Sequence, residues 1–307
     1  MKKFLALLMA ATLMMAVLAG CGGTNNGSSN AGNAGNTTNN TATNDTANNG
    51  AEDNTGDTTA LSGTVNTDGS TSMKDVMGVL TETYNEIQPD VTINYSGTGS
   101  GAGIEAVLAG NVDIGLSSRA LKPEEEEKGA VGHTVALDGV AIVVNPANGV
   151  EDLSVEQIAQ IFKGEITNWS ELGGEDAEIA VLGREDGSGT RSAFEEIVGV
   201  DGECKYTNEY SSTGDVIGNV ASNPNAICYA SLSAVNDSVV AVAVNGVTPS
   251  EETVADGSFA IQRPFVVVTV EGQELSPAAQ AFLDYAMSDE VADIITAAGA
   301  VPASLAA

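Results

Sequence analysis

The chain has 307 residues, enough for two domains with separate hydrophobic cores. It carries 42 Asp and Glu residues against 11 Lys and Arg, which gives a formal net charge of −31. Because so acidic a chain repels phosphate backbones and has no basic, aromatic-interleaved stretch, no nucleic-acid partner is expected.

The first twenty residues have the pattern of a targeting segment. Lys2 and Lys3 precede an apolar run over residues 4–18, which has the length of a signal-peptide core and is short for a membrane span. The run ends in Leu-Ala-Gly before Cys21, which resembles the lipobox of bacterial lipoproteins. That resemblance implies a signal peptide over residues 1–20 and a lipid on the sulfur of Cys21. A plain signal peptide that happens to precede a cysteine is the alternative.

Residues 21–60 follow as a polar stretch built almost entirely from Asn, Thr, Gly, Ser, Ala and Asp. Without large apolar side chains such a stretch cannot bury enough surface to offset the entropy of ordering. We therefore predict a disordered tether that begins at the lipidated cysteine.

The folded part begins with two units of strand, polar turn and helix. A strand near residues 61–65 leads into Ser70, Thr71 and Ser72, and apolar residues then recur at helical spacing as far as Tyr84. A second strand at 91–95 leads into a glycine-rich loop at 96–103, in which Ser100 is the best-placed hydroxyl. The loop matches neither the dinucleotide fingerprint nor the Walker phosphate loop.

The middle of the chain alternates further strands and helices. A strand over 112–116 leads into Ser118 and Arg119, and the acidic run at 124–127 is predicted to be a solvated helical turn. The continuous apolar run at 140–144 is typical of a strand buried on both faces. An amphipathic helix at 153–162 follows, and Trp169 is expected in the core.

A third unit of strand, glycine-rich turn and helix lies at residues 179–198 and has the strongest chemical signal. The first amides of a helix lack backbone partners and carry partial positive charge, so they favour an oxyanion. Ser188 and Thr190 add hydroxyl donors, and Arg184 can present a planar fork to two oxygens of the anion. Asp186 could only accept a proton. A capped helix with a solvated Arg–Asp pair is the structural alternative.

The remaining pattern predicts helices near 212–221, 276–287 and 289–298 and strands near 226–229, 239–244 and 261–270, the last interrupted by Pro264. Alternating strands and helices predict an α/β protein with mainly parallel sheets. Cys204 and Cys228 could form a disulfide or remain free thiols. His133, the single histidine, has no partner at ligand spacing, so neither a metal site nor another cofactor is expected.

Five motifs, in order, resemble those of the phosphate-binding lipoproteins of bacterial ABC importers. They are Gly-Ser-Thr-Ser at 69–72, Tyr-Ser-Gly-Thr-Gly-Ser at 95–100, Asp-Ile-Gly-Leu-Ser-Ser-Arg at 113–119, Ile-Phe-Lys-Gly-Glu-Ile-Thr-Asn-Trp at 161–169 and Arg-Glu-Asp-Gly-Ser-Gly-Thr at 184–190. The resemblance implies a two-lobed hinged binding protein of the type II periplasmic class. The first lobe would combine residues 61–139 and 261–307, and the second would be residues 140–260.

The same resemblance implies the binding residues for phosphate. These are Thr71, Ser72, Ser100, Ser118, Arg184, Asp186, Ser188, Gly189 and Thr190. Some relatives have an aspartate in place of Ser118, so one proton-accepting contact is weaker here. A buried Asp186 would accept the proton of phosphate and repel sulfate, which has none.

The resulting hypothesis is a monomeric, lipid-anchored receptor at the outer face of the cell membrane. It would capture inorganic phosphate and deliver it to an ABC permease and its ATPase. Another oxyanion such as molybdate or tungstate, or a sensing role, is the alternative. A secreted phosphatase is disfavoured, because a lone histidine supports neither a metal cluster nor a serine nucleophile with its base; no enzymatic activity is expected.

Overall fold

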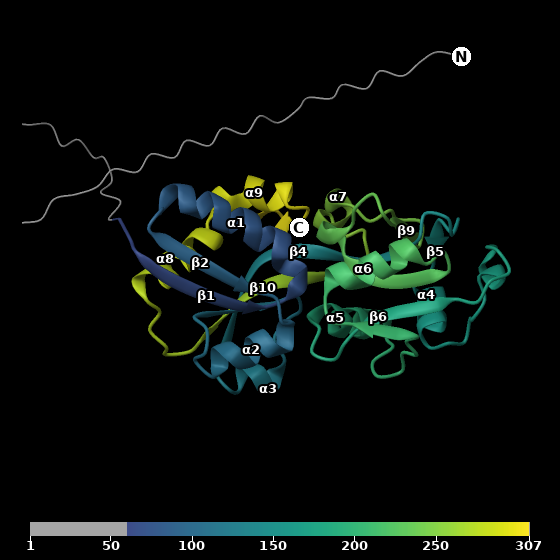
Figure 1. The fold of residues 1–307 in the computed structure, drawn as a ribbon, viewed down its shortest axis with the longest axis horizontal. Coiled ribbons are helices and arrows are strands. Elements are labelled where there is room, and N and C mark those ends of the chain that lie inside the picture. The colour runs from purple at the N-terminus through teal and green to yellow at the C-terminus, as the bar shows by residue number, and fades with distance from the viewer. Residues whose placement is uncertain (1–59, 307) are drawn as a thin grey trace, which may run out of the picture. The chain divides into compact units, whose positions relative to one another are not determined.

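The computed structural model describes residues 60–306, which form an α/β fold. The predicted signal peptide, Cys21 and all but the last residue of the predicted tether lie outside the described residues. Within residues 60–306, eleven strands form one sheet whose main path runs β2-β1-β3-β10-β4-β8-β6-β7. Helices cover it in two groups, one around the β2 end and one around the β6 end (Figure 1). The same part of the chain has no helix with the length and apolar character needed to cross a bilayer.

The first group of elements forms one lobe. It contains β1 (Gly63–Gly69), η1 (Thr71–Met73), α1 (Lys74–Ile87), β2 (Val91–Ser96), α2 (Ser100–Leu108), β3 (Ile114–Ser117), α3 (Pro123–Glu126), α8 (Pro277–Ala286), η4 (Asp289–Val291) and α9 (Ala292–Ala297). The second group contains β5 (Asp152–Leu153), α4 (Val155–Phe162), η2 (Trp169–Leu172), β6 (Ala180–Arg184), α5 (Gly189–Val198), β7 (Asn208–Tyr210), α6 (Thr213–Ser222), β8 (Ala226–Ser231), η3 (Leu232–Ala234), β9 (Val240–Val244) and α7 (Glu251–Ala255). The C-terminal β11 (Val301–Pro302) pairs with β4, and η5 (Ala303–Leu305) follows it.

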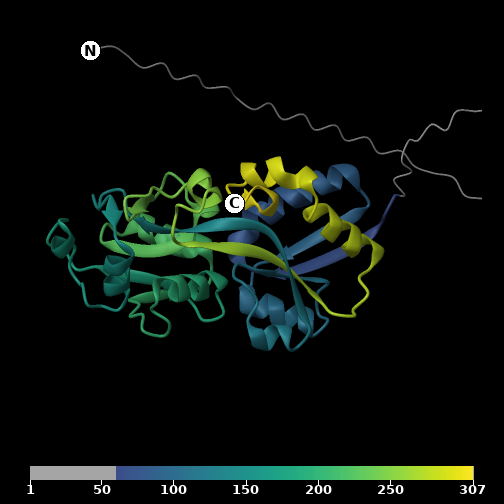
Figure 2. The same cartoon turned by 180° about the vertical axis from the view of Figure 1, so that it is seen from behind.

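Two long strands, β4 (Ala130–Val144) and β10 (Gln262–Val270), connect the lobes. They pair antiparallel along nine residue pairs, from Gln262–Gly139 to Val270–Ala130. Seen from behind, they pass side by side between the two groups of helices (Figure 2). The sequence predicted only residues 140–144 of β4, because Gly132, His133 and Asp138 interrupt the apolar pattern of the segment before it.

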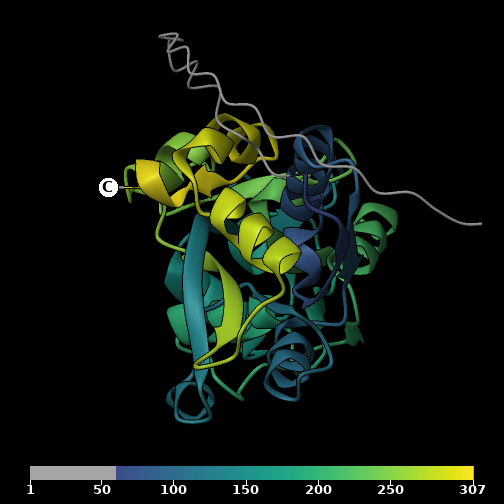
Figure 3. The ribbon, with the colours of Figure 1, turned by 90° about the vertical axis from the view of Figure 1, so that its left-hand side faces the viewer.

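The two faces of the sheet in the first lobe are covered by different helices. Val76 and Leu80 of α1 pack with Phe282 of α8 in one core, and α9 joins them on the same side of the strands (Figure 3). Ile104 and Val107 of α2 pack against the other face, next to β10. Because each fully buried apolar side chain contributes about 1.5–3 kcal/mol, these paired cores hold the strand ends in place.

The second lobe repeats this arrangement. Along β4, Val140, Ile142 and Val144 enter the core that contains Phe162 and Phe194. Ala141 and Val143 enter the opposite core, which α6 covers with Ile217. The predicted strand buried on both faces is therefore confirmed, and so is the core position of Trp169, which is 1% exposed.

The α/β class is confirmed, but the sheet is mixed. β1 pairs parallel with β2 and β3, and β6 pairs parallel with β7 and β8. The antiparallel pairs all involve β4 or β10, since these strands run between the lobes in opposite directions. Pro264 does not end β10: it pairs with Leu137, and the register shifts between Phe265 and Val266.

Candidate functional site

A narrow cavity lies where the two lobes meet, and in this structure it has no room for a water molecule. Its walls are the starts of three helical segments and the ends of two strands. The lining residues are Ser70, Thr71, Gly99, Ser100, Ser118, Arg184, Ser188, Gly189 and Thr190. Since the first amides of a helix have no partner within it, a cavity at the starts of α2 and α5 favours a small anion.

Gly189 brings the start of α5 against the opposite lobe. A Cβ atom at this position would collide with the side chain of Ser100 and would lie 2.8 Å from Ser118 Oγ. Only glycine permits so close an approach of backbone to these two hydroxyls. The preceding residue, Ser188, caps α5 by accepting a hydrogen bond from the Arg191 amide at 3.3 Å.

Arg184 stands at the end of β6 and is 2% exposed. Its guanidinium donates to the carbonyl oxygens of Tyr210 (3.0 Å) and Ser211 (2.8 Å) and to Thr213 Oγ1 (3.1 Å). Among residues 60–306 it forms no ion pair with a carboxylate. Burial lowers the pKa of the guanidinium, yet an arginine stays protonated in proteins, so the cavity contains a buried positive charge without a counter-ion.

The hydroxyl of Ser70 is a second sign of a missing ligand. Ser70 is 1% exposed, and its Oγ has no hydrogen-bond partner among the described residues, although it borders the cavity. An unpaired buried hydroxyl costs about 1–3 kcal/mol, so such groups are nearly always satisfied. A bound oxyanion would accept this hydrogen bond.

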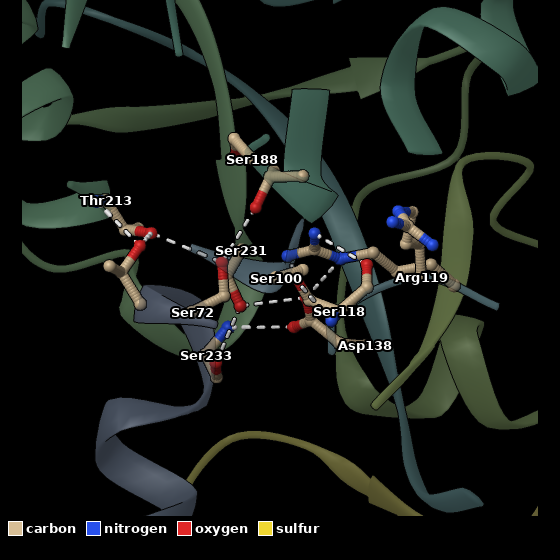
Figure 4. A network of polar contacts seen from close by, with 12 residues as sticks. Ser72, Ser100, Ser118, Arg119, Asp138, Ser188, Thr213, Ser231 and Ser233 are labelled. Carbon is tan, nitrogen blue, oxygen red and sulfur yellow. Dashed lines mark hydrogen bonds and ion pairs between the residues drawn. The ribbon is translucent and has the colours of Figure 1, made fainter. Parts of the chain in front are cut away.

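Ser100 and Ser118 form the wall contributed by the first lobe. The Ser118 amide donates to Ser100 Oγ at 3.1 Å, and the two side-chain oxygens lie 3.3 Å apart. Behind them, the buried Arg263 donates to the Ser118 carbonyl at 3.0 Å and pairs with Asp138 at 3.0 Å. Figure 4 shows Asp138 near Ser118, and its carboxylate accepts hydrogen bonds from the Ser231 hydroxyl and the Ser233 backbone amide. This pair holds β4 and β10 together and fixes the Ser118 backbone.

Arg119 turns away from the cavity. Its guanidinium forms two hydrogen bonds with Glu125, at 2.7 and 2.8 Å, and in Figure 4 it points to the side opposite Ser100. The charge is therefore already neutralised. Arg119 is not among the residues that line the cavity.

The prediction for Asp186 requires a correction. Its side chain is 97% exposed and its Oδ1 lies 3.2 Å from Arg191 Nη1, outside the cavity. The reason is local: the turn after β6 is closed by a hydrogen bond from the Ser188 amide to the Glu185 carbonyl, and Asp186 lies at its tip. In this geometry Asp186 cannot accept a proton from an anion in the cavity.

All but one of the other predicted residues line the cavity, and the exception, Ser72, lies directly behind the lining. Thr71, Ser100, Ser118, Arg184, Ser188, Gly189 and Thr190 all line the cavity. Ser72 lies just behind it and contacts Thr190 Oγ1 at 2.8 Å.

Sequence reasoning left two residues out of the site. Ser70 borders the cavity, and the hydroxyl run at 70–72 was its signal. Thr213 contacts both Arg184 and Thr71. Its signal was the Ser-Thr pair at the start of the helix predicted at 212–221.

The histidine and the two cysteines among the described residues lie outside the cavity lining. No group of three or more His, Cys, Asp or Glu side chains within residues 60–306 is arranged to hold a metal ion. His133 Nε2 lies 2.9 Å from Thr269 Oγ1, on the strands that join the lobes. Cys204 and Cys228 are free thiols, and burial raises the pKa of Cys204 to about 11.

Comparison with known proteins identifies the family of the chain. The family model described as "PBP superfamily domain" matches residues 34–290. The phosphate-binding protein PstS of Bacillus subtilis (strain 168) is 34% identical over 307 residues, covering 98% of this chain and 94% of the relative. The chain belongs to the PstS family of the PBP superfamily. The predicted family is thereby confirmed.

Solved structures of PstS-like proteins share the fold. A phosphate ABC transporter substrate-binding protein from Clostridium perfringens, determined with bound phosphate, is 40% identical with a TM-score of 0.74. The alignment covers 78% of this chain and 99% of that one. An ABC-type phosphate transport receptor from Vibrio cholerae is 33% identical with a TM-score of 0.65, over 77% and 99% of the two chains.

Proposed function

We propose that this PstS-family chain binds inorganic phosphate in the cavity between its lobes and delivers it to an ABC permease and ATPase for import. The ligand accepts hydrogen bonds from the hydroxyls and helix amides of the wall. These donors come from Ser70, Thr71, Ser100, Ser118, Arg184, Ser188, Gly189 and Thr190, while Ser72 supports Thr190 from behind. The phosphate-bound relative from Clostridium perfringens supports this choice of ligand.

The observation that carries the proposal is the buried guanidinium of Arg184. A cation taken out of water without a partner is costly, and removing one partner of a buried ion pair destabilises proteins by about 3–5 kcal/mol. Arg184 keeps its charge in a cavity lined by hydroxyls and free of carboxylates among the lining residues. A tetrahedral oxyanion provides both the counter-charge and acceptors for the hydroxyl protons.

Calorimetry on residues 60–307 tests the proposal directly. We expect phosphate to bind with a micromolar or lower Kd, in one site per chain. Molybdate, tungstate and sulfate are measured alongside, at the same ionic strength. If phosphate does not bind, or if molybdate or tungstate binds at least tenfold more tightly, phosphate is not the ligand.

Sulfate is the informative competitor, because the carboxylate expected to reject it lies outside the cavity. With Asp186 exposed, any preference for phosphate must come from hydroxyl or backbone oxygens that accept its proton. Neutral acceptors discriminate less strongly than a carboxylate does. We therefore expect sulfate to compete measurably, at a Kd weaker than that of phosphate.

The role is one of binding and not of catalysis. One relative is named as a phosphate-binding protein and another as a substrate-binding protein of a phosphate ABC transporter. We expect the purified protein to hydrolyse no chromogenic phosphate ester, in a preparation whose phosphate binding has been confirmed by calorimetry. Sustained hydrolysis would support the phosphatase alternative.

The cellular setting completes the proposal. The chain acts outside the cytoplasm as a monomer, held at the cell membrane by a lipid on Cys21.

Its first lobe comprises residues 61–139 and 261–307, and its second comprises residues 140–260. The core memberships of Ala136 and Val140, and of Ile261 and Phe265, support these boundaries. Substitution Cys21→Ala should release the protein into the medium, whereas wild-type protein should partition into detergent.

A further inference from the structure

Four hydroxyls meet across the boundary between the lobes, next to the cavity. Thr71 and Ser72 come from the first lobe, and Thr190 and Thr213 come from the second. Thr213 Oγ1 lies 3.1 Å from Thr71 Oγ1 and 3.2 Å from Ser72 Oγ, and the Thr213 amide donates to Thr71 Oγ1 at 3.3 Å. Figure 4 shows Thr213 and Ser72 facing each other. Thr213 itself is 3% exposed and does not line the cavity.

The positions of the protons in this cluster follow from the chemistry of its members. A guanidinium can only donate, so the hydrogen bond between Arg184 Nη1 and Thr213 Oγ1, at 3.1 Å, uses the threonine oxygen as acceptor. Thr213 then has a single hydroxyl proton left to donate. Its two remaining neighbours are Thr71 and Ser72, and both belong to the opposite lobe. The positive charge of Arg184 polarises a hydroxyl that donates across the boundary.

We propose that Thr213 is a positioning residue that couples the anion-binding arginine to closure of the lobes. The proposal rests on the proposed function, since the ligand whose escape it concerns is the anion at Arg184; the Tyr210 and Ser211 carbonyls already orient the guanidinium. With Arg184 fixed, Thr213 keeps the orientation in which it bonds to Thr71 or Ser72. Opening of the lobes breaks these contacts, so Thr213 slows the escape of bound ligand.

A backbone contact across the same boundary gives an independent measure of closure. The Gly101 amide donates to the Gly187 carbonyl at 2.9 Å, and neither group depends on a side chain. Exchange of the Gly101 amide with solvent deuterium therefore reports opening of the lobes, with or without ligand.

The test compares three variants. Thr213→Val keeps the shape of the side chain and removes its oxygen, and Thr213→Ser keeps the oxygen. Ser212→Ala is the matched control: Ser212 caps α6 by accepting from the Asp215 amide, and its hydroxyl donates to Asp215 Oδ2, so its hydrogen bonds stay within the second lobe. Release and association of radiolabelled phosphate are measured for each, together with deuterium exchange over residues 97–104 in the ligand-free proteins.

We expect Thr213→Val to release phosphate about tenfold faster with an unchanged association rate, because it loses hydrogen bonds made only in the closed state. Thr213→Ser and Ser212→Ala should stay within about twofold of wild type. Exchange at Gly101 should rise in Thr213→Val alone.

Unchanged release and unchanged exchange in Thr213→Val would overturn the proposal, and so would equal effects in Ser212→Ala. If wild-type protein binds no phosphate, the proposed function fails. In that case the exchange experiment alone decides whether Thr213 holds the lobes closed.

Discussion

Two buried arginines lie on either side of the cavity wall, and their surroundings differ in one respect. Arg184 and Arg263 are each 2% exposed, and both donate to backbone carbonyls. Arg263 is paired with Asp138, whose carboxylate also accepts from Ser231 at 2.8 Å. Arg184 has no carboxylate partner within residues 60–306. The fold itself provides a counter-charge for Arg263, whereas the counter-charge for Arg184 must come from a ligand.

This difference decides whether each arginine contributes mainly to the stability of the fold or to ligand binding. Breaking the Arg263–Asp138 pair should damage the ligand-free protein, since it leaves one charge buried alone. Removing Arg184 should damage binding and destabilise the fold less, because it leaves neutral acceptors but no charge without a partner. Substitution of Arg263 should therefore lower mainly the stability, and substitution of Arg184 should lower mainly the affinity for phosphate.

The largest expected effect is on stability. Arg263→Met leaves Asp138 unpaired in the hinge, the pair of strands β4 and β10 that connects the lobes. We expect the free energy of unfolding to fall by about 3–5 kcal/mol. Chemical denaturation of the ligand-free protein measures this loss. The double variant Arg263→Met/Asp138→Leu, which buries no charge, should recover most of it. A single variant within about 1 kcal/mol of wild type would mean that the pair is not a stabilising feature of the hinge.

The next effect is on affinity. Arg184→Met removes the one guanidinium that lines the cavity among residues 60–306, and calorimetry should show phosphate binding weakened at least about a hundredfold, or about 2.8 kcal/mol. The unfolding free energy of the ligand-free variant should fall less than that of Arg263→Met, because the change leaves neutral acceptors and no charge without a partner. Arg184→Lys is the control that keeps the positive charge but loses the planar fork of the guanidinium. Its Kd for phosphate should lie between those of wild type and Arg184→Met. An unchanged Kd in Arg184→Met would place the arginine outside the binding site.

Ligand should stabilise only the protein that can hold it. At a phosphate concentration of about 100 times Kd, the wild-type unfolding free energy should rise by about 2.7 kcal/mol. Arg184→Met should show no such rise under the same conditions. Sodium chloride at equal ionic strength controls for general salt effects. Equal stabilisation of both proteins would indicate that phosphate binds elsewhere.

The smallest expected effect belongs to Asp186. Its exposed carboxylate contacts Arg191, which also pairs with Glu195 and Glu209. We expect Asp186→Asn to change the phosphate Kd less than about twofold, since exposed ion pairs contribute about 0–1 kcal/mol. The ratio of sulfate to phosphate affinity should also stay constant. A tenfold change in that ratio would return Asp186 to the role that the sequence suggested.

Local patterns in the sequence indicated part of the site, and the family resemblance supplied the other candidate residues. The strand, glycine turn and helix around Ser188 and Gly189 fix the direction of the backbone amides, because helix geometry leaves the first donors unpaired. The same logic placed Thr71 and Ser100 at other helix starts that line the cavity. The continuous apolar run at 140–144 predicted a strand buried on both faces for an equally local reason.

Other features required the tertiary structure. The exposed position of Asp186 depends on how a four-residue turn closes, and its sequence neighbours do not specify that. The Arg263–Asp138 pair joins residues 125 positions apart, and the Thr71–Thr213 contact joins residues 142 apart. Such contacts follow from the antiparallel crossing of β4 and β10 and from the meeting of two lobes. The sequence by itself determined that an anion should bind at these helix starts; only the tertiary structure decided which side chains face it, because side-chain direction at a lobe boundary is set by distant segments packing together.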